Sequence, residues 1–291
     1  MQVEIKNLSY IYNPKSPFEK RALDRIDLEI EEGDFFGIIG HTGSGKSTLV
    51  SHINALTRVQ RKYNADATLK VCGIDLCAKK PDVKTLREKV GMVFQYPEYQ
   101  LFADTVRQDV GYGPKNLGLG ERETEERVRD AIERVGLDYD EVAERSPFEL
   151  SGGQKRRVAI AGVIAMRPEV LILDEPTAGL DPEGKKDLLG LFARLQKEAC
   201  PTIVMVSHNM DEVAERCNKV AVMGEGKVLG VFTPRELFTR RELIKGMGME
   251  MPSVTELACF LADGGIPVDP SCLTERELTD ELIKIFCGEA K

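Results

Sequence analysis

Hydrophobic and polar residues alternate in the first part of the chain. Residues 3–5 and 26–30 place an apolar side chain at every second position, which is the pattern of strands with one buried and one solvated face. A turn signal at residues 32–34 comes next, and residues 35–39 are apolar on both faces. The pattern predicts an antiparallel β region that leads into one fully buried strand.

Two later runs, residues 170–173 and 203–206, are also apolar on both faces. Each follows a segment with helical periodicity, at about residues 152–166 and 184–198. Buried strands that alternate with amphipathic helices are typical of an α/β core around a parallel sheet. Residues 218–232 alternate again around a Gly-Glu-Gly turn and predict a hairpin.

Helical segments also lie outside this alternation. A charged segment at residues 121–137 predicts a helix within a separate helical insert, which we place at about residues 96–166. The character of the chain changes near residue 235. We therefore expect a first domain at residues 1–235 and a small C-terminal helical extension at residues 236–291.

The C-terminal extension contains two short helical patterns, at about residues 253–264 and 274–287. The second begins with Thr274 at a helix N-cap position and Glu277 three residues later, the spacing of a capping box. The sequence thus predicts a pair of helices near the end of the chain.

Composition supports a globular protein. Of the 291 residues, 42% are hydrophobic and 30% charged, and 40 Lys and Arg against 48 Asp and Glu give a net charge of −8. General nucleic-acid binding needs a basic face against the phosphates, so we expect no nucleic-acid partner. The balance still permits a local basic cluster that holds a nucleotide.

No apolar run approaches the roughly 18–20 residues that span a bilayer, and residues 1–6 lack the pattern of a cleaved signal. The seven cysteines are scattered and odd in number, as in reduced cytosolic proteins. We expect a chain in the cytosol, where it can still dock on a membrane protein.

A glycine-rich loop follows the buried strand at residues 35–39 and precedes a helical pattern. The loop matches the G-x-x-x-x-G-K-[ST] phosphate-binding pattern and, with the next residue, reads Gly40-His41-Thr42-Gly43-Ser44-Gly45-Lys46-Ser47-Thr48. Its glycines let the backbone turn N–H groups toward a phosphate, and the following helix adds its N-terminal dipole. Lys46 would supply a charge to the β- and γ-phosphates, and the Ser47 hydroxyl would ligate Mg²⁺. We expect the Lys46 side chain to face solvent without ATP.

An acidic pair, Asp174 and Glu175, follows the apolar run at residues 170–173. The carboxyl ends of strands are the edge at which α/β sheets bind ligands. Asp174 is expected to hold Mg²⁺, mostly through water, and Glu175 to polarise the attacking water. A lone acidic pair is usually a solvated turn, but here it accompanies a phosphate loop.

Further motifs in a fixed order resemble those of ATP-binding cassette (ABC) ATPases. Gln95 resembles their Q-loop glutamine and His208 their switch histidine, while the signature motif and the D-loop aspartate correspond to Ser151-Gly152-Gly153-Gln154 and Asp181. With the phosphate loop and the acidic strand, these motifs cover about residues 3–235. The resemblance implies an ABC-type α/β fold and an ATP hydrolase.

The resemblance also implies a role for each motif. The signature residues open a helix whose free N–H groups form an anion site, and in the family this site and the D-loop close on the ATP of a second ATPase subunit. Gln95 is expected to contact the metal ion, and both Gln95 and His208 are expected to act in catalysis with Glu175.

An aromatic residue in the N-terminal β region corresponds to the adenine-stacking position of the family. Tyr12 lies some thirty residues before the phosphate loop and fits this role, because an aromatic face binds a purine at low entropic cost. Tyr10 is the rival, since it lies two residues away.

The segment after Gln95 narrows the resemblance further. Residues 96–102 read Tyr-Pro-Glu-Tyr-Gln-Leu-Phe and resemble the ATPases of energy-coupling factor transporters, which import cobalt and vitamins. That family implies an ATPase on the cytoplasmic side of the cell membrane, a second ABC ATPase (homo- or heterodimer), a transmembrane coupling subunit and a membrane substrate-capture subunit. Leu101 and Phe102 are then expected to line the groove for coupling helices, and the C-terminal helical extension at residues 236–291 is expected to help in dimerisation of the two ATPases.

Three alternatives remain open at this point. A conventional importer ATPase fed by a soluble binding protein shares the same motifs. ABC proteins of DNA repair or translation usually carry long coiled coils or two cassettes, neither of which fits this sequence. A phosphate-loop kinase would not need the signature motif at residues 151–154.

Overall fold

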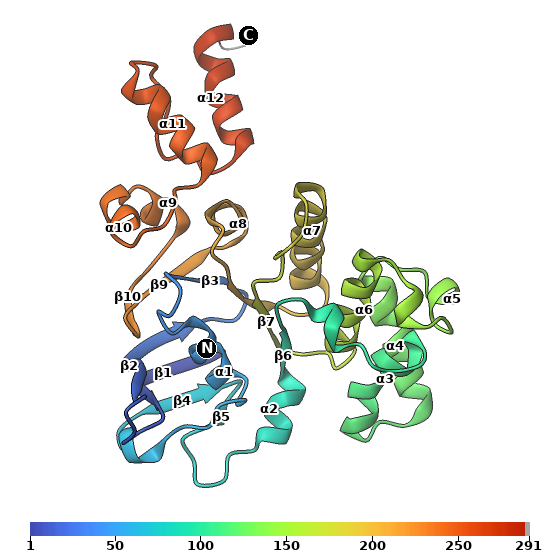
Figure 1. Cartoon of the computed structure of the whole chain (residues 1–291). Helices are drawn as coiled ribbons and strands as arrows, with labels where there is room; N and C mark the ends of the chain where they lie inside the picture. Colours follow the sequence, from blue (N-terminus) through green and yellow to red (C-terminus); the bar gives the residue numbers. More distant parts are fainter. Residues whose placement is uncertain (289–291) are drawn as a thin grey trace.

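The structure is a computed structural model that describes residues 1–288. Two sheets form its centre (Figure 1). The larger has six strands in the order β10-β9-β3-β8-β7-β6, and the smaller has four strands in the order β2-β1-β4-β5. The predicted α/β core with a parallel sheet and an N-terminal antiparallel region is confirmed.

The six-stranded sheet carries the apolar runs seen in the sequence. Its strands are β3 (Phe35–Ile39), β6 (Val90–Val93), β7 (Val170–Asp174), β8 (Thr202–Val206), β9 (Lys219–Gly224) and β10 (Lys227–Phe232). The strands from β9 to β6 pair in parallel, and β10 pairs antiparallel with β9 as the predicted hairpin. Parallel pairing brings the carboxyl ends of β3, β6, β7 and β8 to one edge of the sheet.

The four-stranded sheet is antiparallel throughout. It consists of β1 (Val3–Tyr12), β2 (Lys20–Ile30), β4 (Thr68–Val71) and β5 (Ile74–Asp75). Register shifts interrupt the pairing of β1 with β2 between Ile5 and Ile11. Both strands are longer than the alternating segments that predicted them, residues 3–5 for β1 and residues 26–30 for β2.

A group of helices lies together in the predicted insert, beside the six-stranded sheet (Figure 1). The insert holds α3 (Val106–Leu117), α4 (Glu121–Arg134), α5 (Tyr139–Val142) and α6 (Gly152–Ile164). The other helices before the C-terminal pair are α1 (Lys46–Ile53), α2 (Val83–Lys89), α7 (Pro182–Glu198), α8 (Met210–Arg216), α9 (Pro234–Phe238) and α10 (Arg241–Gly246). Short 3₁₀ turns occur at Arg61–Tyr63, Pro97–Gln100 and Pro147–Glu149.

The two faces of β3 belong to two different hydrophobic cores. Phe36 and Ile38 lie in the core shared with α1 and the four-stranded sheet. Phe35 and Ile39 lie in the core shared with α7 and the helical insert. The apolar character of both faces thus reflects burial on both sides, as expected for a central parallel strand.

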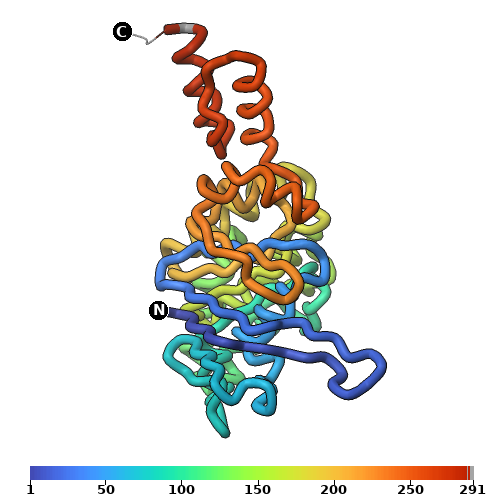
Figure 2. The backbone as a smooth tube through the Cα atoms, turned by 90° about the vertical axis from the view of Figure 1, so that its left-hand side faces the viewer, coloured from blue at the N-terminus to red at the C-terminus, as the bar shows by residue number. Residues whose placement is uncertain are grey.

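The C-terminal pair, α11 (Ser253–Asp263) and α12 (Glu275–Cys287), extends away from the body of the molecule (Figure 2). It has a small hydrophobic cluster of its own. Thr274 caps α12 as predicted, but the predicted capping box is incomplete, because the Glu277 carboxylate accepts from the N–H of Leu273 and not from that of Thr274. α9 and α10 pack instead on the core of the insert side. The domain boundary near residue 235 stays a prediction. Within residues 1–288, no helix has the length and apolarity to cross a membrane.

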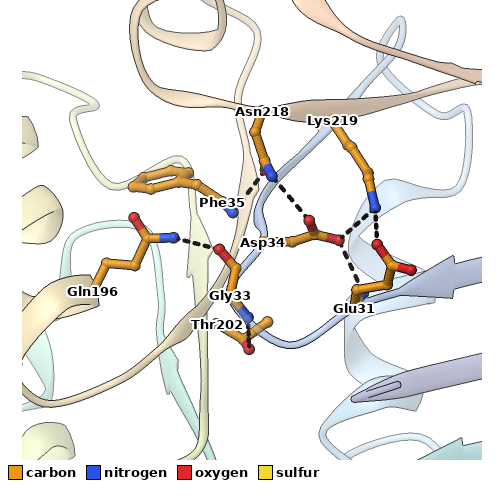
Figure 3. A network of polar contacts seen from close by, with 8 residues as sticks. All are labelled: Glu31, Gly33, Asp34, Phe35, Gln196, Thr202, Asn218 and Lys219. Atoms are coloured by element: carbon orange, nitrogen blue, oxygen red, sulfur yellow. Dashed lines mark hydrogen bonds and ion pairs between the residues drawn. The ribbon is translucent and has the colours of Figure 1, made fainter.

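A polar network ties together the amino ends of the strands (Figure 3). At its centre the buried Asp34 carboxylate accepts from the Asn218 side chain at 2.9 Å and from the backbone N–H of Glu31 at 2.9 Å. Lys219 forms ion pairs with Asp34 and Glu31. We call these four residues the amino-edge network. They join the turn before β3 to the start of β9.

Candidate active site

The phosphate loop connects β3 to α1, as the sequence predicts. Two of its glycines are required by close backbone contacts. A Cβ on Gly40 would lie 2.2 Å from the Met223 carbonyl oxygen, and one on Gly45 would lie 2.5 Å from that of Ala22. Both glycines also have positive φ values, which other residues adopt only under strain. The loop is therefore held tightly against β2 and β9.

The Lys46 side chain is buried in this loop rather than exposed, so the expectation of a solvent-facing ammonium is wrong. Its Nζ donates to the carbonyl oxygens of Gly40 at 2.6 Å and His41 at 3.1 Å. The loop folds back over the ammonium, and burial lowers the pKa of Lys46 although Glu175 and Asp174 oppose that shift. A desolvated cation in a backbone loop is well prepared to receive an anion.

Polar groups of the loop surround a small cavity. Ser44 Oγ is buried and has no hydrogen-bond partner among residues 1–288. Buried hydroxyls are nearly always bonded, so this unpartnered hydroxyl is an exception within the loop. The adjacent cavity measures about 190 Å³ and is lined by Tyr12, Lys20, Ala22, Gly43, Gly45, Lys46, Ser47 and Thr48.

Tyr12 and Tyr10 differ in their access to this cavity. Tyr12 lines it and is 40% exposed, and its Oη lies 3.1 Å from Thr48 Oγ1. Tyr10 instead packs edge-on against both Tyr12 and the buried His52. The geometry favours Tyr12 as the residue that offers a ring to a base.

The acidic pair lies at the carboxyl end of β7, beside β8. Burial, and then the charge of Glu175, raise the pKa of Asp174 above its usual range, while Lys46 lowers it. Glu175 has a left-handed backbone with φ of 49°, which takes its side chain out of the strand alternation. Its N–H donates to the carbonyl oxygen of Val206 at 2.9 Å. The two carboxylates thus sit at one edge of the sheet, near Lys46.

Glu175 brings together the predicted catalytic residues. Gln95 Nε2 donates to Glu175 Oε2 at 3.2 Å, and His208 Nδ1 lies 3.3 Å from Glu175 Oε1. These side chains come from the ends of β6, β7 and β8, three neighbouring strands. The His208 side chain is 70% exposed, so it can reach a ligand from this position.

The donors around the loop fit a magnesium ion. Mg²⁺ prefers oxygen ligands and commonly takes only one or two from protein, leaving the rest to phosphates and water. Ser47 offers an exposed hydroxyl, Asp174 a desolvated carboxylate and Gln95 a side-chain amide oxygen. Among residues 1–288 there is no cluster of three or more His, Cys, Asp or Glu side chains suited to a metal ion. These donors suit a metal that arrives with a nucleotide.

The signature residues lie elsewhere, at the start of α6. Ser151 and Gln154 form a reciprocal capping box, in which each side chain accepts from the backbone N–H of the other. Gly152 and Gly153 are exposed, and a Cβ added to either would have no atom of another residue within 4 Å. Asp181 likewise caps α7 and is exposed. None of these residues lines the cavity beside the phosphate loop.

Sequence reasoning missed a buried ion pair behind the site. Arg156 of α6 makes a two-pronged contact with the Glu98 carboxylate at 2.9 and 3.0 Å, and also donates to the carbonyl oxygens of Pro176 and Ala178. Arg156 is 4% exposed. It joins the segment after Gln95, the signature helix and the turn after Glu175. The available signal was helical register, because Arg156 shares a face with the buried Ile160 and Ile164.

A second depression lies beside Gln95, between α3, α6 and β6. Its volume is about 430 Å³, and its wall includes Leu101, Phe102, Tyr112 and Met166. Phe102 is exposed and meets Tyr112 edge-on. The predicted groove residues Leu101 and Phe102 thus both line an apolar groove.

This fold and site define a phosphate-loop ATPase of the ATP-binding cassette class. A family model described as "ABC transporter" matches residues 23–178. The chain is 47% identical over 290 residues to the energy-coupling factor transporter ATP-binding protein EcfA2 of Clostridium tetani, with 100% of this chain and 99% of the relative covered. The corresponding protein of Clostridium perfringens is 47% identical, with 98% and 99% covered.

Solved structures of ABC ATPases also match this chain. The structure of cbiO1 from Clostridium perfringens, described as part of the ABC transporter complex cbiONQ, matches with a TM-score of 0.72 and 36% identity, over 88% of this chain and 98% of that one. A dimeric ATP-binding cassette, MJ0796, in a post-hydrolysis state with ADP and Pi matches with a TM-score of 0.67 and 27% identity, over 80% and 98%. The chain therefore belongs to the ABC transporter family, among its energy-coupling factor ATP-binding proteins. The resemblance read from the motifs is confirmed.

Proposed function

We propose that this chain is the ATP-hydrolysing motor subunit of an energy-coupling factor importer, which drives uptake of a vitamin or metal ion through membrane partner subunits. One observation carries the catalytic part of the proposal: Gln95 and His208 converge on Glu175, next to a phosphate loop with a buried lysine. The full-length similarity to energy-coupling factor ATP-binding proteins supports this assignment over a conventional importer.

ATP binds at the phosphate loop in this proposal. The N–H groups of residues 40–48 and the Lys46 ammonium hold the phosphates, and the adenine stacks on Tyr12. Bound phosphate replaces the two carbonyl oxygens that now accept from Lys46. The unpartnered Ser44 hydroxyl supplies one more donor within the loop.

Ser47, Gln95 and Asp174, the last mostly through water, would hold Mg²⁺, which would supply positive charge beside the phosphates. Asp174 is prepared for this role because a raised pKa marks a carboxylate that gains from a nearby cation.

Glu175 polarises the attacking water. Its two oxygens are oriented by the Gln95 amide and the His208 ring, and the left-handed backbone holds the carboxylate off the strand. His208 can also turn toward the γ-phosphate, because most of its side chain is exposed. Proton transfer to a positioned side chain contributes typically about 10²–10⁴-fold to a rate.

The site is completed by a second ABC ATPase subunit. Ser151, Gly152, Gly153 and Gln154 present an exposed helix N-terminus away from this chain's own cavity, and Asp181 is exposed at the start of α7. In the assembled dimer these groups contact the partner's nucleotide. The dimeric cassette among the solved relatives supports this arrangement.

The groove lined by Leu101 and Phe102 receives the transmembrane coupling subunit, so the chain is peripheral on the cytoplasmic side of the cell membrane. A separate membrane subunit captures the substrate. The test is a pull-down of the tagged full-length chain from detergent-extracted membranes, with mass spectrometry. Recovery of a second ABC ATPase and integral membrane proteins is the expected result. Recovery of an importer that works with a soluble substrate-binding protein would favour the conventional type, and recovery of no integral protein would contradict the proposal.

A further inference from the structure

A second carboxylate lies behind the catalytic residues and has no role in the mechanism so far. Glu212 belongs to α8 and is 4% exposed. Its Oε1 accepts from the Thr177 hydroxyl at 2.6 Å, and its Oε2 accepts from the Ser207 hydroxyl at 2.9 Å. All three side chains are buried.

The two hydroxyls belong to the two segments that carry the catalytic groups. Thr177 comes two residues after Glu175, and Ser207 comes directly before His208. The segments also meet through the backbone, where the N–H of Glu175 donates to Val206. Glu212 thus connects, through side chains, the segment after β7 and the segment after β8.

A carboxylate is an unusual choice for this place. Burying a charge without a cation is expensive, and both recorded side-chain partners of Glu212 are neutral hydroxyls. Each hydroxyl has one proton to donate, and a carboxylate offers two acceptor oxygens. Both hydroxyls therefore donate to Glu212 through strong, short hydrogen bonds, which orients them toward it. The rotamers of Thr177 and Ser207 are thereby fixed together.

We propose that Glu212 is a positioning residue for ATP hydrolysis, which sets the placement of Glu175 relative to His208 through Thr177 and Ser207. The inference rests on the proposed roles of Glu175 and His208. It assigns Glu212 no contact with the nucleotide. Because small misplacements of a reacting group can reduce a rate by about 10²-fold, loss of this connection affects turnover more than binding.

The chain offers a matched control. Asp34 is also 4% exposed and is also a carboxylate that connects segments of the same sheet. It belongs to the amino-edge network, at the opposite ends of the strands (Figure 3). Its removal reproduces the loss of a buried carboxylate without touching the segments that carry Glu175 and His208.

The experiment measures kcat, KM for ATP, equilibrium ATP binding and thermal melting in the complete complex purified with its membrane subunits. The variants are Glu212→Ala, Glu212→Gln, the double variant Thr177→Val/Ser207→Ala, the triple variant that adds Glu212→Ala to it, and Asp34→Ala. Rates are expressed per folded complex. Wild type and Glu175→Gln are measured alongside.

Glu212→Ala is expected to lower kcat by about 10²-fold with little change in KM or ATP affinity. Glu212→Gln is expected to recover part of the rate, since an amide still accepts from one hydroxyl and donates to the other. The double variant is expected to resemble Glu212→Ala, and the triple variant to be no slower than either. Asp34→Ala is expected to lose stability while it keeps the wild-type kcat.

Wild-type kcat in Glu212→Ala, or an equal fall of kcat in Asp34→Ala, would overturn the positioning role while leaving the proposed function intact. If Glu212→Ala does not fold, the double variant Thr177→Val/Ser207→Ala decides the question, because it keeps the carboxylate and removes only its two donors. A wild-type kcat in this double variant would overturn the inference. A wild-type complex that does not hydrolyse ATP, or a Glu175→Gln complex of undiminished rate, would instead contradict the proposed function, and the inference with it.

Discussion

The two edges of the six-stranded sheet place Asp34 and Asp174 in different surroundings. At the amino edge, both Asp34 oxygens are engaged by Asn218, Lys219 and the Glu31 backbone. At the carboxyl edge, Asp174 lies in a desolvated place beside a second carboxylate, and the Ser44 hydroxyl has no partner within residues 1–288. The amino edge satisfies Asp34 with groups of its own chain, and the carboxyl edge does the same for Glu212 but leaves the Ser44 hydroxyl without a partner within residues 1–288.

The difference has a consequence for stability. The pKa of Asp174 is raised in the folded chain above the reference value of 3.8. A raised pKa in an acid contributes stability below the unfolded pKa, and this contribution is lost as pH rises through the folded pKa. The ionised form of Asp174 therefore contributes less to stability than the protonated form, although Lys46 offsets part of this difference. Strain at Glu175 acts in the same direction.

The largest expected effect is at the carboxyl edge. Glu175→Gln should keep ATP binding, because Lys46 and the loop amides are unchanged, and should lose turnover by about 10²–10⁴-fold, roughly 3–5 kcal/mol of barrier. ATPase rate in the purified complex and equilibrium ATP binding are measured together. A near-wild-type rate would remove Glu175 from the mechanism.

The next largest effect is expected at the ion pair of Arg156 and Glu98. Its loss measures how much the buried contacts behind the carboxyl edge contribute to the free energy of unfolding. Arg156→Gln leaves the Glu98 carboxylate without its cation, and breaking a buried ion pair in this way costs about 3–5 kcal/mol in free energy of unfolding. Denaturant unfolding measures the loss. The neighbouring Arg157 donates to the Val135 carbonyl oxygen and forms no ion pair within residues 1–288. Arg157→Gln is therefore the control and should lower the free energy of unfolding clearly less. Equal losses in the two variants would contradict the special role of Arg156.

A smaller effect is expected at the amino edge. Asp34→Ala leaves Asn218 and the Glu31 N–H without their acceptor, and we expect it to cost about 1–3 kcal/mol in free energy of unfolding. ATP affinity should not change, because the network lies at the other ends of the strands. Titration calorimetry with ATP checks this, and a clear loss of affinity would break the distinction between the two edges.

The smallest effect concerns the adenine ring. Tyr12→Ala should weaken ATP binding by about 0.5–1.5 kcal/mol, the usual value of an aromatic contact. Tyr12→Phe keeps the ring and loses only the contact with Thr48, so it should bind almost as well as wild type. If Tyr10→Ala weakens ATP binding and Tyr12→Ala does not, Tyr10 is the stacking residue.

Local patterns were enough to predict the phosphate loop, the acidic strand end and about half of the helices, because each depends on residues that are neighbours in sequence. The roles of Gln95 and His208 beside Glu175 followed only from the family resemblance. Contacts between distant segments could not be predicted from periodicity: Glu98 and Arg156 are 58 residues apart, and Asp34 and Asn218 are 184 apart. The burial of Lys46 was missed for a different reason, since it depends on where the loop carbonyls point.

Hydrogen–deuterium exchange of the full-length chain with and without Mg·ATP tests the central claim most directly, because it compares both edges in one sample. The account predicts slower exchange at residues 40–48, where loop amides bind phosphate, and unchanged exchange at residues 31–35 and 218–219. Protection at the amino edge with none in the phosphate loop would contradict it.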